Sequence, residues 1–132
     1  MATDADLRGL GFSMPQSIRL GRTPVFVDAT GIDWGSAYKI KATEYIVIVN
    51  SVHEGSGLIL PPFAGERGAM IGDAFTICNR ASDTIRVYTS TVDGTITGGG
   101  KAHPGDFGFA VEPFWVANFI LVSAKEWIGF IA

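Results

Sequence analysis

The chain has 132 residues, of which 47% are hydrophobic and 17% charged, and its formal net charge is −3. This length fits one domain with one core, the single cysteine excludes an intrachain disulfide, and the slightly acidic balance gives little attraction for a nucleic-acid phosphate backbone. The apolar fraction is high for a lone domain of this size, so two interpretations stay open: a well-filled β core, or apolar surface covered by partner molecules.

The N-terminal segment differs in character from the rest of the chain. Its first six residues are acidic and polar, where a secretory signal would be basic and then apolar, so no export signal is expected. Residues 1–16 contain Gly9, Gly11 and Pro15 and show little apolar periodicity. This composition predicts an extended arm rather than a core element, and we expect the arm to become ordered on a partner.

From Ser17 onward, short runs rich in Val, Ile, Thr, Phe and Tyr alternate with clusters of Gly, Pro, Asn and Asp. This pattern is typical of strands joined by turns. It predicts one all-β domain over residues 17–132, with eight or nine short strands in an antiparallel β-sandwich or a jelly-roll-like fold. Beyond a short turn near Ser123–Glu126, no helix is expected. The predicted strands are Ser17–Leu20, Pro24–Asp28, Tyr38–Asn50, Leu58–Pro61, Ala74–Asn79, Thr84–Ser90, Phe107–Glu112, Phe119–Ser123 and Trp127–Ile131.

The predicted strands differ in how many apolar faces they carry. In the strand that begins at Thr84, Ile85 and Val87 share one face, which predicts a half-exposed strand. In contrast, residues 45–49 are apolar on both faces, so this strand is either central or covered by another subunit. Residues 114–122 form another apolar stretch. Because this stretch has only about half the length of a membrane span, we expect a soluble protein.

Several motifs predict turns. Asn79 is suited to the turn that leads into the strand from Thr84, and Asp93-Gly94 is a strong hairpin signal. Pro104-Gly105 suits the central positions of a type II turn. The glycine-rich stretch 98–101 lacks the spacing of a phosphate-binding loop and is interpreted as a flexible hairpin tip.

From Gly57 to the C-terminus, the motifs follow a specific order. They are Leu58-Ile59-Leu60-Pro61-Pro62, Asp73-Ala74-Phe75-Thr76-Ile77-Cys78-Asn79, Asp83-Thr84-Ile85-Arg86-Val87-Tyr88, Gly94-Thr95-Ile96-Thr97-Gly98, His103-Pro104-Gly105-Asp106 and Lys125-Glu126-Trp127. This order resembles a recurring domain of tailed-bacteriophage structural proteins, which occurs in capsid decoration (cement) proteins, head fibres and tail-fibre modules. The sequence departs from this pattern at two places. Residues 1–56 contain none of the motifs, and residues 98–101 contain more glycine than the corresponding part of the pattern.

The resemblance implies a β-sandwich or jelly-roll fold, assembly as homotrimers and attachment to a virion. We therefore expect a capsid decoration protein that is made in the host cytoplasm and lies on the capsid surface. Its partners would be its own copies and the major capsid protein or another virion protein, without nucleic acid or membrane. The N-terminal arm is the predicted lattice contact. The candidate interface residues are Tyr45, Val47, Val49, Phe114, Trp115 and Phe119.

Two other functions stay open. The first is a carbohydrate- or receptor-binding module of a phage tail or head fibre, in which aromatic side chains would stack on sugar rings. The aromatic residues considered for it are Trp34, Tyr38, Phe63, Trp115 and Trp127. The alternative interpretation of these residues is that they anchor the core and the interfaces. The second is a small β-barrel enzyme.

The polar residues argue against the enzyme. His53, His103 and Asp106 could in principle bind a metal, but they have no motif spacing, and both histidines are expected to be solvated in loops. Cys78 is expected to be a buried small hydrophobe. Two carboxylates could also form a site for glycoside hydrolysis. The favoured interpretation is instead that the acidic residues cap turns, as Asp commonly does. The residues considered are Asp73, Asp83, Asp93, Asp106 and Glu112. We expect no catalytic residues, no cofactor and no metal.

Overall fold

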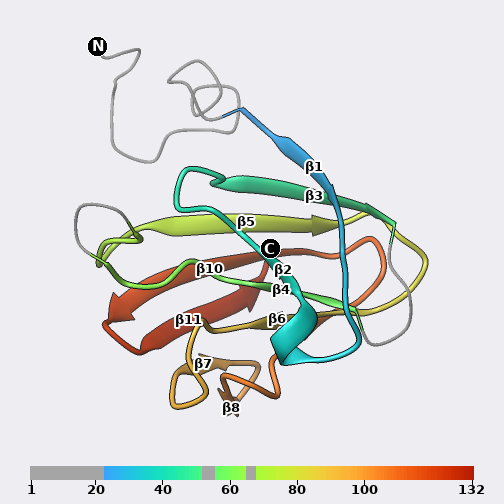
Figure 1. Cartoon of the computed structure of the whole chain (residues 1–132). Coiled ribbons are helices and arrows are strands. Elements are labelled where there is room, and N and C mark those ends of the chain that lie inside the picture. The colour runs from blue at the N-terminus through green and yellow to red at the C-terminus, as the bar shows by residue number, and fades with distance from the viewer. Residues whose placement is uncertain (1–22, 52–55, 65–67) are drawn as a thin grey trace.

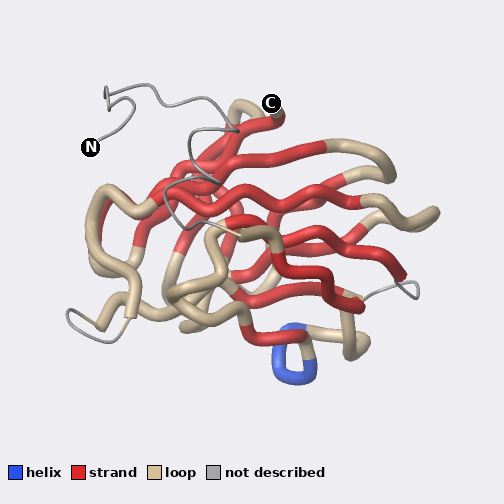
Figure 2. The backbone as a smooth tube through the Cα atoms, turned by 90° about the horizontal axis from the view of Figure 1, so that it is seen from above, coloured by secondary structure: helices blue, strands red, loops and turns tan. Residues whose placement is uncertain are grey.

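The computed structural model describes residues 23–51, 56–64 and 68–132, which form two β-sheets packed as a sandwich (Figure 1). The seven-stranded sheet has the order β1 (Val25–Asp28), β3 (Ile46–Ser51), β5 (Ala74–Asn79), β10 (Val116–Ser123), β11 (Glu126–Ile131), β7 (Thr95–Gly98) and β8 (Lys101–Pro104). The four-stranded sheet has the order β2 (Tyr38–Lys39), β4 (Gly57–Ile59), β6 (Ile85–Tyr88) and β9 (Phe109–Val111). A single turn of 3₁₀ helix, η1 (Trp34–Ser36), lies outside the strands (Figure 2).

The chain passes from one sheet to the other after each of its first six strands. β1, β3 and β5 are therefore parallel neighbours in one sheet, and β2, β4 and β6 are parallel neighbours in the other. Antiparallel pairing enters with the β7–β8 hairpin, with β9, which pairs with β6, and with β10, which pairs with both β5 and β11. The last strand, β11, is parallel to β7. The predicted all-β sandwich is confirmed, but the predicted antiparallel or jelly-roll-like arrangement is wrong, because the sheets are mixed. When the chain crosses to the other sheet and back between two neighbouring strands, these two strands run in the same direction and pair in parallel.

Most predicted strands are present with small changes of length. Ala74–Asn79 matches β5 at both ends, because its alternating apolar residues are bounded by turn residues on either side. Residues 38–50 divide into β2 and β3, and the glycine-rich region adds β7 and β8, so the described residues contain more strands than the eight or nine expected. The predicted strand Ser17–Leu20 and the N-terminal arm lie outside the described residues.

Glycine conformation explains the β7–β8 hairpin. Gly98 pairs with Lys101, and the two residues between them, Gly99 and Gly100, have φ angles of 65° and 87°. Positive φ at both central positions is the requirement of a type I′ turn, which only glycine, Asn and Asp meet easily. The predicted hairpin tip is therefore confirmed at this position.

Two of the other turn predictions, at Asp93-Gly94 and at Pro104-Gly105, need correction. Asp93-Gly94 lies in a turn, but this turn joins β6 of one sheet to β7 of the other instead of closing a hairpin. In the turn after β8, Pro104 is the first residue, because its carbonyl accepts hydrogen bonds from the backbone N–H groups of Phe107 and Gly108. Gly105 is required there by close packing, since a Cβ atom would overlap the Thr89 hydroxyl.

The core lies between the sheets and is almost entirely apolar. Val47, Ile77 and Phe119 of the seven-stranded sheet face Leu58 and Val87 of the four-stranded sheet, and all five side chains are fully buried. Phe109 contacts Phe119 edge-on across the sandwich, with ring centroids 5.5 Å apart. Because each such side chain contributes about 1.5–3 kcal/mol on burial, this layer is the main stabilising feature. Within the described ranges, no helix has the length and apolar character of a membrane span.

The strand β6 is more buried than the sequence predicts. Ile85 and Val87 point into the core as expected. Tyr88, on the opposite face, is buried as well, because it packs with Ala37 and Trp34 in a second, smaller apolar cluster. The segment that contains η1 therefore covers part of the outer surface of the four-stranded sheet.

Candidate interface and binding pocket

The outward side of the seven-stranded sheet carries an apolar area over β1, β3, β5, β10 and the second half of β11, and we call this area the outer face. The register of the strands assigns to it Phe26, Ile46, Ile48, Ala74, Thr76, Cys78, Val116, Asn118, Ile120, Ile128 and Phe130. None of these side chains is charged. The carboxylate of Glu126, at the start of β11, lies on the same side of the sheet but outside this area, where it accepts a hydrogen bond from the Thr97 hydroxyl. The two polar ones satisfy each other, because the Thr76 hydroxyl donates a hydrogen bond of 2.7 Å to Asn118 Oδ1.

Large apolar side chains at the borders of the outer face are exposed. Phe26 on β1 is 57% exposed, and on β11 Ile128 and Phe130 are 42% and 45% exposed. A sheet that faces water normally alternates apolar residues inward with polar residues outward. An uncharged face with exposed aromatic residues is instead typical of a surface that another molecule covers.

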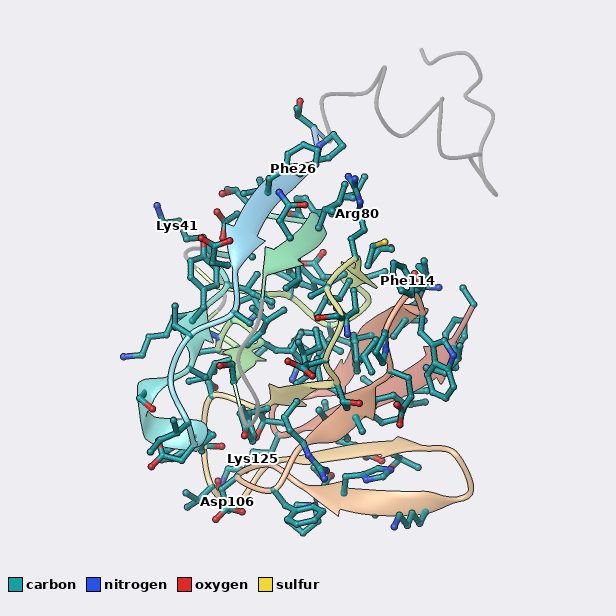
Figure 3. All side chains as sticks on the ribbon, turned by 90° about the vertical axis from the view of Figure 1, so that its right-hand side faces the viewer. Phe26, Lys41, Arg80, Asp106, Phe114 and Lys125 are labelled. Atoms are coloured by element: carbon teal, nitrogen blue, oxygen red, sulfur yellow. The ribbon has the colours of Figure 1, made fainter. Side chains whose placement is uncertain are left out.

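Phe114 and Trp115 extend this apolar surface at the start of β10. Phe114 is 74% exposed and has a φ angle of 66°, a left-handed conformation that a residue with an aromatic side chain rarely adopts. Its backbone N–H donates to the carbonyl of Asn79, which holds the segment in place. Figure 3 shows Phe26, Arg80 and Phe114 along one margin of the molecule. Strained backbone at an exposed aromatic residue points to a function for that residue.

The six predicted interface residues separate into two groups. Phe114 and Trp115 are exposed, and Tyr45 is half-buried and stacks on Phe75. Val47, Val49 and Phe119 are fully buried between the sheets, so a partner cannot reach them. The reason is that residues 45–49 are apolar on both faces, and the sequence does not show which face is inward.

The exposed residues of the outer face that the sequence reasoning missed lie mainly on β1 and β11. Phe26 and Ile128 belong to predicted strands in which neighbouring positions are both apolar. That two-sided pattern is the signal that could have identified them. Cys78 also lies on the outer face and is half-buried, rather than being a core residue as predicted.

A cavity of about 420 Å³ opens at the other sheet. Its lining consists of Trp34, Gly35, Lys39, Ile40, Ile59, Leu60, Pro62, Ser90 and Thr91. The parallel strands β2, β4 and β6 all have their carboxyl ends at this edge, and Ile40, Leu60 and Ser90 follow them. Because successive parallel strands leave the sheet here by separate loops, a hollow forms between the loops. No sequence motif indicates this pocket.

The polar residues considered for chemistry serve local structure. His103 is half-buried on β8, where Nε2 lies 3.0 Å from the Gly98 carbonyl and the ring contacts Phe109 edge-on, so the expectation of a solvated loop histidine is wrong. Asp73 caps a turn by accepting from the Met70 backbone N–H. His53 lies outside the described residues. Within the described ranges, no three His, Cys, Asp or Glu side chains gather as a metal site.

The aromatic residues considered for sugar stacking do not form one exposed platform. Trp127 is buried in the core and contacts Phe75 edge-on, and Tyr38 packs against the same core. Phe63 and Trp115 are exposed, whereas Trp34 lines the pocket.

Comparison with protein-family models, curated proteins and solved structures found no match to this chain.

Proposed function

We propose that this chain is a capsid decoration protein of a tailed bacteriophage, which associates with its own copies as a trimer and binds the capsid shell. The observation that carries the proposal is the uncharged outer face, with Phe26, Ile128 and Phe130 exposed on it. The order of motifs from residue 57 to residue 132 supports the assignment to this class of virion protein.

The proposed mechanism is binding without chemistry. Interfaces are enriched in aromatic residues and arginine and depleted of other charged residues at their centre. The outer face has this character: Phe26 and Phe130 are exposed on it, and Arg80 lies between Phe26 and Phe114 along one margin of the molecule (Figure 3). A protein that binds only the assembled shell stabilises it by about 4 kcal/mol at a thousandfold excess over Kd.

The first test is the solution mass of the purified chain, measured by light scattering at several concentrations. A trimer would have three times the protomer mass of 14.0 kDa, about 42 kDa. We expect Ile128→Lys to give a monomer, because association would bury an unpaired charge. Val92→Lys is the matched control, since Val92 is 55% exposed but lies in the loop between β6 and β7.

Each outcome of this test has a clear meaning. A wild-type monomer at every concentration would contradict self-association, and equal loss of mass in both variants would show that the outer face is not the contact. Binding to shells is then measured by co-sedimentation with shells assembled from the phage's major capsid protein. There, failure of the wild type to sediment would exclude decoration.

A further inference from the structure

The pocket at the carboxyl edge of the four-stranded sheet is separate from the outer face, and the proposed assembly does not use it. Its floor is aliphatic and is formed by Ile40, Ile59, Leu60 and Pro62. One wall is the indole of Trp34. A cavity of about 420 Å³ lies within the range of roughly 300–1,000 Å³ that is usual for small-molecule sites.

The indole wall is held in place before any ligand arrives. Trp34 Nε1–H donates a hydrogen bond of 2.8 Å to the carbonyl of Thr89. The Asp33 carboxylate caps η1 by accepting from both the backbone N–H and the hydroxyl of Ser36. Because these contacts fix the ring, ligand binding would not have to order it, which favours affinity.

Among the lining residues that the structure describes, Lys39 is the only charged one. It follows Tyr38 on the edge strand β2, its side chain is exposed, and it forms no ion pair with a described carboxylate. Two acidic side chains close in sequence to lining residues have other partners: Glu44 accepts from the Tyr38 hydroxyl, and Asp93 pairs with Lys125. An anionic group at Lys39 would therefore meet little competition.

The lining also limits what the rest of a ligand can be. Within the described lining, the indole N–H of Trp34 is occupied by the Thr89 carbonyl, and the other polar side-chain groups are the Lys39 ammonium and the hydroxyls of Ser90 and Thr91. The aliphatic floor offers no side-chain hydrogen-bond partner. A buried hydroxyl without a partner costs about 1–3 kcal/mol, so a sugar with several hydroxyls fits poorly. An apolar or aromatic body fits well.

We propose that this pocket binds a carboxylate with an apolar or aromatic body, with the body against Trp34 and the aliphatic floor and the carboxylate at Lys39. The same chemistry occurs in a free small carboxylic acid and in the last residue of a polypeptide chain. Either source would satisfy the pocket.

The test is a titration followed by two-dimensional NMR of the full chain, with N-acetyl-L-phenylalanine as the probe. The signals to follow are the Trp34 indole N–H and the backbone N–H groups of Ile40, Ser90 and Thr91. We expect these signals to shift, and N-acetyl-L-phenylalaninamide, which lacks the carboxylate, to bind at least about tenfold more weakly. Equal binding of acid and amide, or no shift up to millimolar probe, would overturn the proposal.

Two variants test whether the Lys39 ammonium is the group that binds the carboxylate of the ligand. Lys39→Met keeps the apolar stem and removes the ammonium, and we expect it to weaken binding of the acid about tenfold. Lys41→Met is the matched control, because Lys41 is exposed nearby but does not line the pocket. Equal effects of the two variants would contradict a role for Lys39, as would shifts of the same signals by a neutral methyl glycoside.

A further pair of probes separates the two sources. If a pentapeptide ending in phenylalanine binds more tightly than the single residue, and its C-terminal amide does not bind, the ligand is a chain terminus. If only the single residue binds, the ligand is a small acid. Neither result depends on the solution mass, so the assembly proposal and the pocket proposal can fail separately.

Discussion

At the scale of single residues, Asn79 joins the two sheets through a side chain that is fully buried. Its Nδ2 donates to the carbonyls of Asp83 and Val111, at 2.8 and 3.0 Å, and its Oδ1 accepts from the backbone N–H of Ala81. Because it lies at the end of β5 and contacts β9, it closes one end of the sandwich. The turn that the sequence assigns to this residue is thus held by the side chain itself.

We expect Asn79→Ala to lower the free energy of unfolding by about 2–4 kcal/mol, because it removes the hydrogen bonds of two buried backbone groups, the Val111 carbonyl and the Ala81 N–H, and of one part-buried group, the Asp83 carbonyl. The measurement is urea denaturation followed by tryptophan fluorescence. Asn50→Ala, at an exposed asparagine on β3, is the control and should change stability by less than about 0.5 kcal/mol. A loss below about 1 kcal/mol at Asn79 would show that water satisfies these groups equally well.

Phe114 is the other residue whose backbone is informative. At most positions a protein with glycine is less stable than the same protein with alanine. At the φ angle of 66° of Phe114, this order should reverse. We expect Phe114→Gly to be more stable than Phe114→Ala by about 1 kcal/mol, measured by the same denaturation. If the Phe114→Ala variant proves more stable than Phe114→Gly, the backbone at this position is not strained. Both variants should also weaken self-association, because each removes an exposed aromatic side chain.

At the scale of elements, the loop between β6 and β7 is tied to the turn between β10 and β11. Lys125 Nζ lies 2.5 Å from Asp93 Oδ2, and both side chains are exposed. The hydrogen bond from Lys125, and then that from Thr91, hold the pKa of the Asp93 carboxyl below its ordinary value. The contact therefore connects two loops that lie far apart in the sequence.

The sign of the resulting pH dependence follows from the lowered pKa. Asp93 contributes stability above the ordinary carboxyl pKa of about 3.9, and this contribution is lost as the pH falls through the lower value in the folded state. We expect the urea midpoints of the wild type and Asp93→Asn to differ at neutral pH and to converge in acid, with a smaller difference in 1 M salt.

Asp106→Asn is the control, because Asp106 is an exposed turn residue with no ion pair to a described residue. A difference between wild type and Asp93→Asn that does not shrink as the pH falls, or that is unaffected by salt, would show that charge is not the cause.

At the scale of the whole molecule, the two sheets differ on their outward sides. The segment containing η1 covers part of the four-stranded sheet, where Trp34 packs with Ile59 and Tyr88. On the seven-stranded sheet Phe26, Ile128 and Phe130 stay exposed. This asymmetry separates the proposed assembly surface from the pocket, so that a copy docked on one sheet leaves the other accessible.

The site was less predictable than the strands. Phe114 and Trp115 are predicted interface residues because they begin a long apolar stretch, and their side chains are exposed. Val47 and Val49 were named from the same kind of pattern, yet they are buried, because the inward side of a two-sided apolar strand depends on its neighbours. The pocket gave no local signal, since its lining comes from η1 and from the ends of three strands.

The sequence by itself determined that the chain is built of strands and turns. Alternation in segments such as residues 74–79 and positive φ at Gly99 and Gly100 are local properties, set by the side chains and backbone of a few neighbouring residues. Only the tertiary structure decided that strands pair in parallel after crossing between sheets, and which apolar face became the core. Strand pairing is a contact between residues distant in sequence, so it is settled by the packing of the whole sandwich.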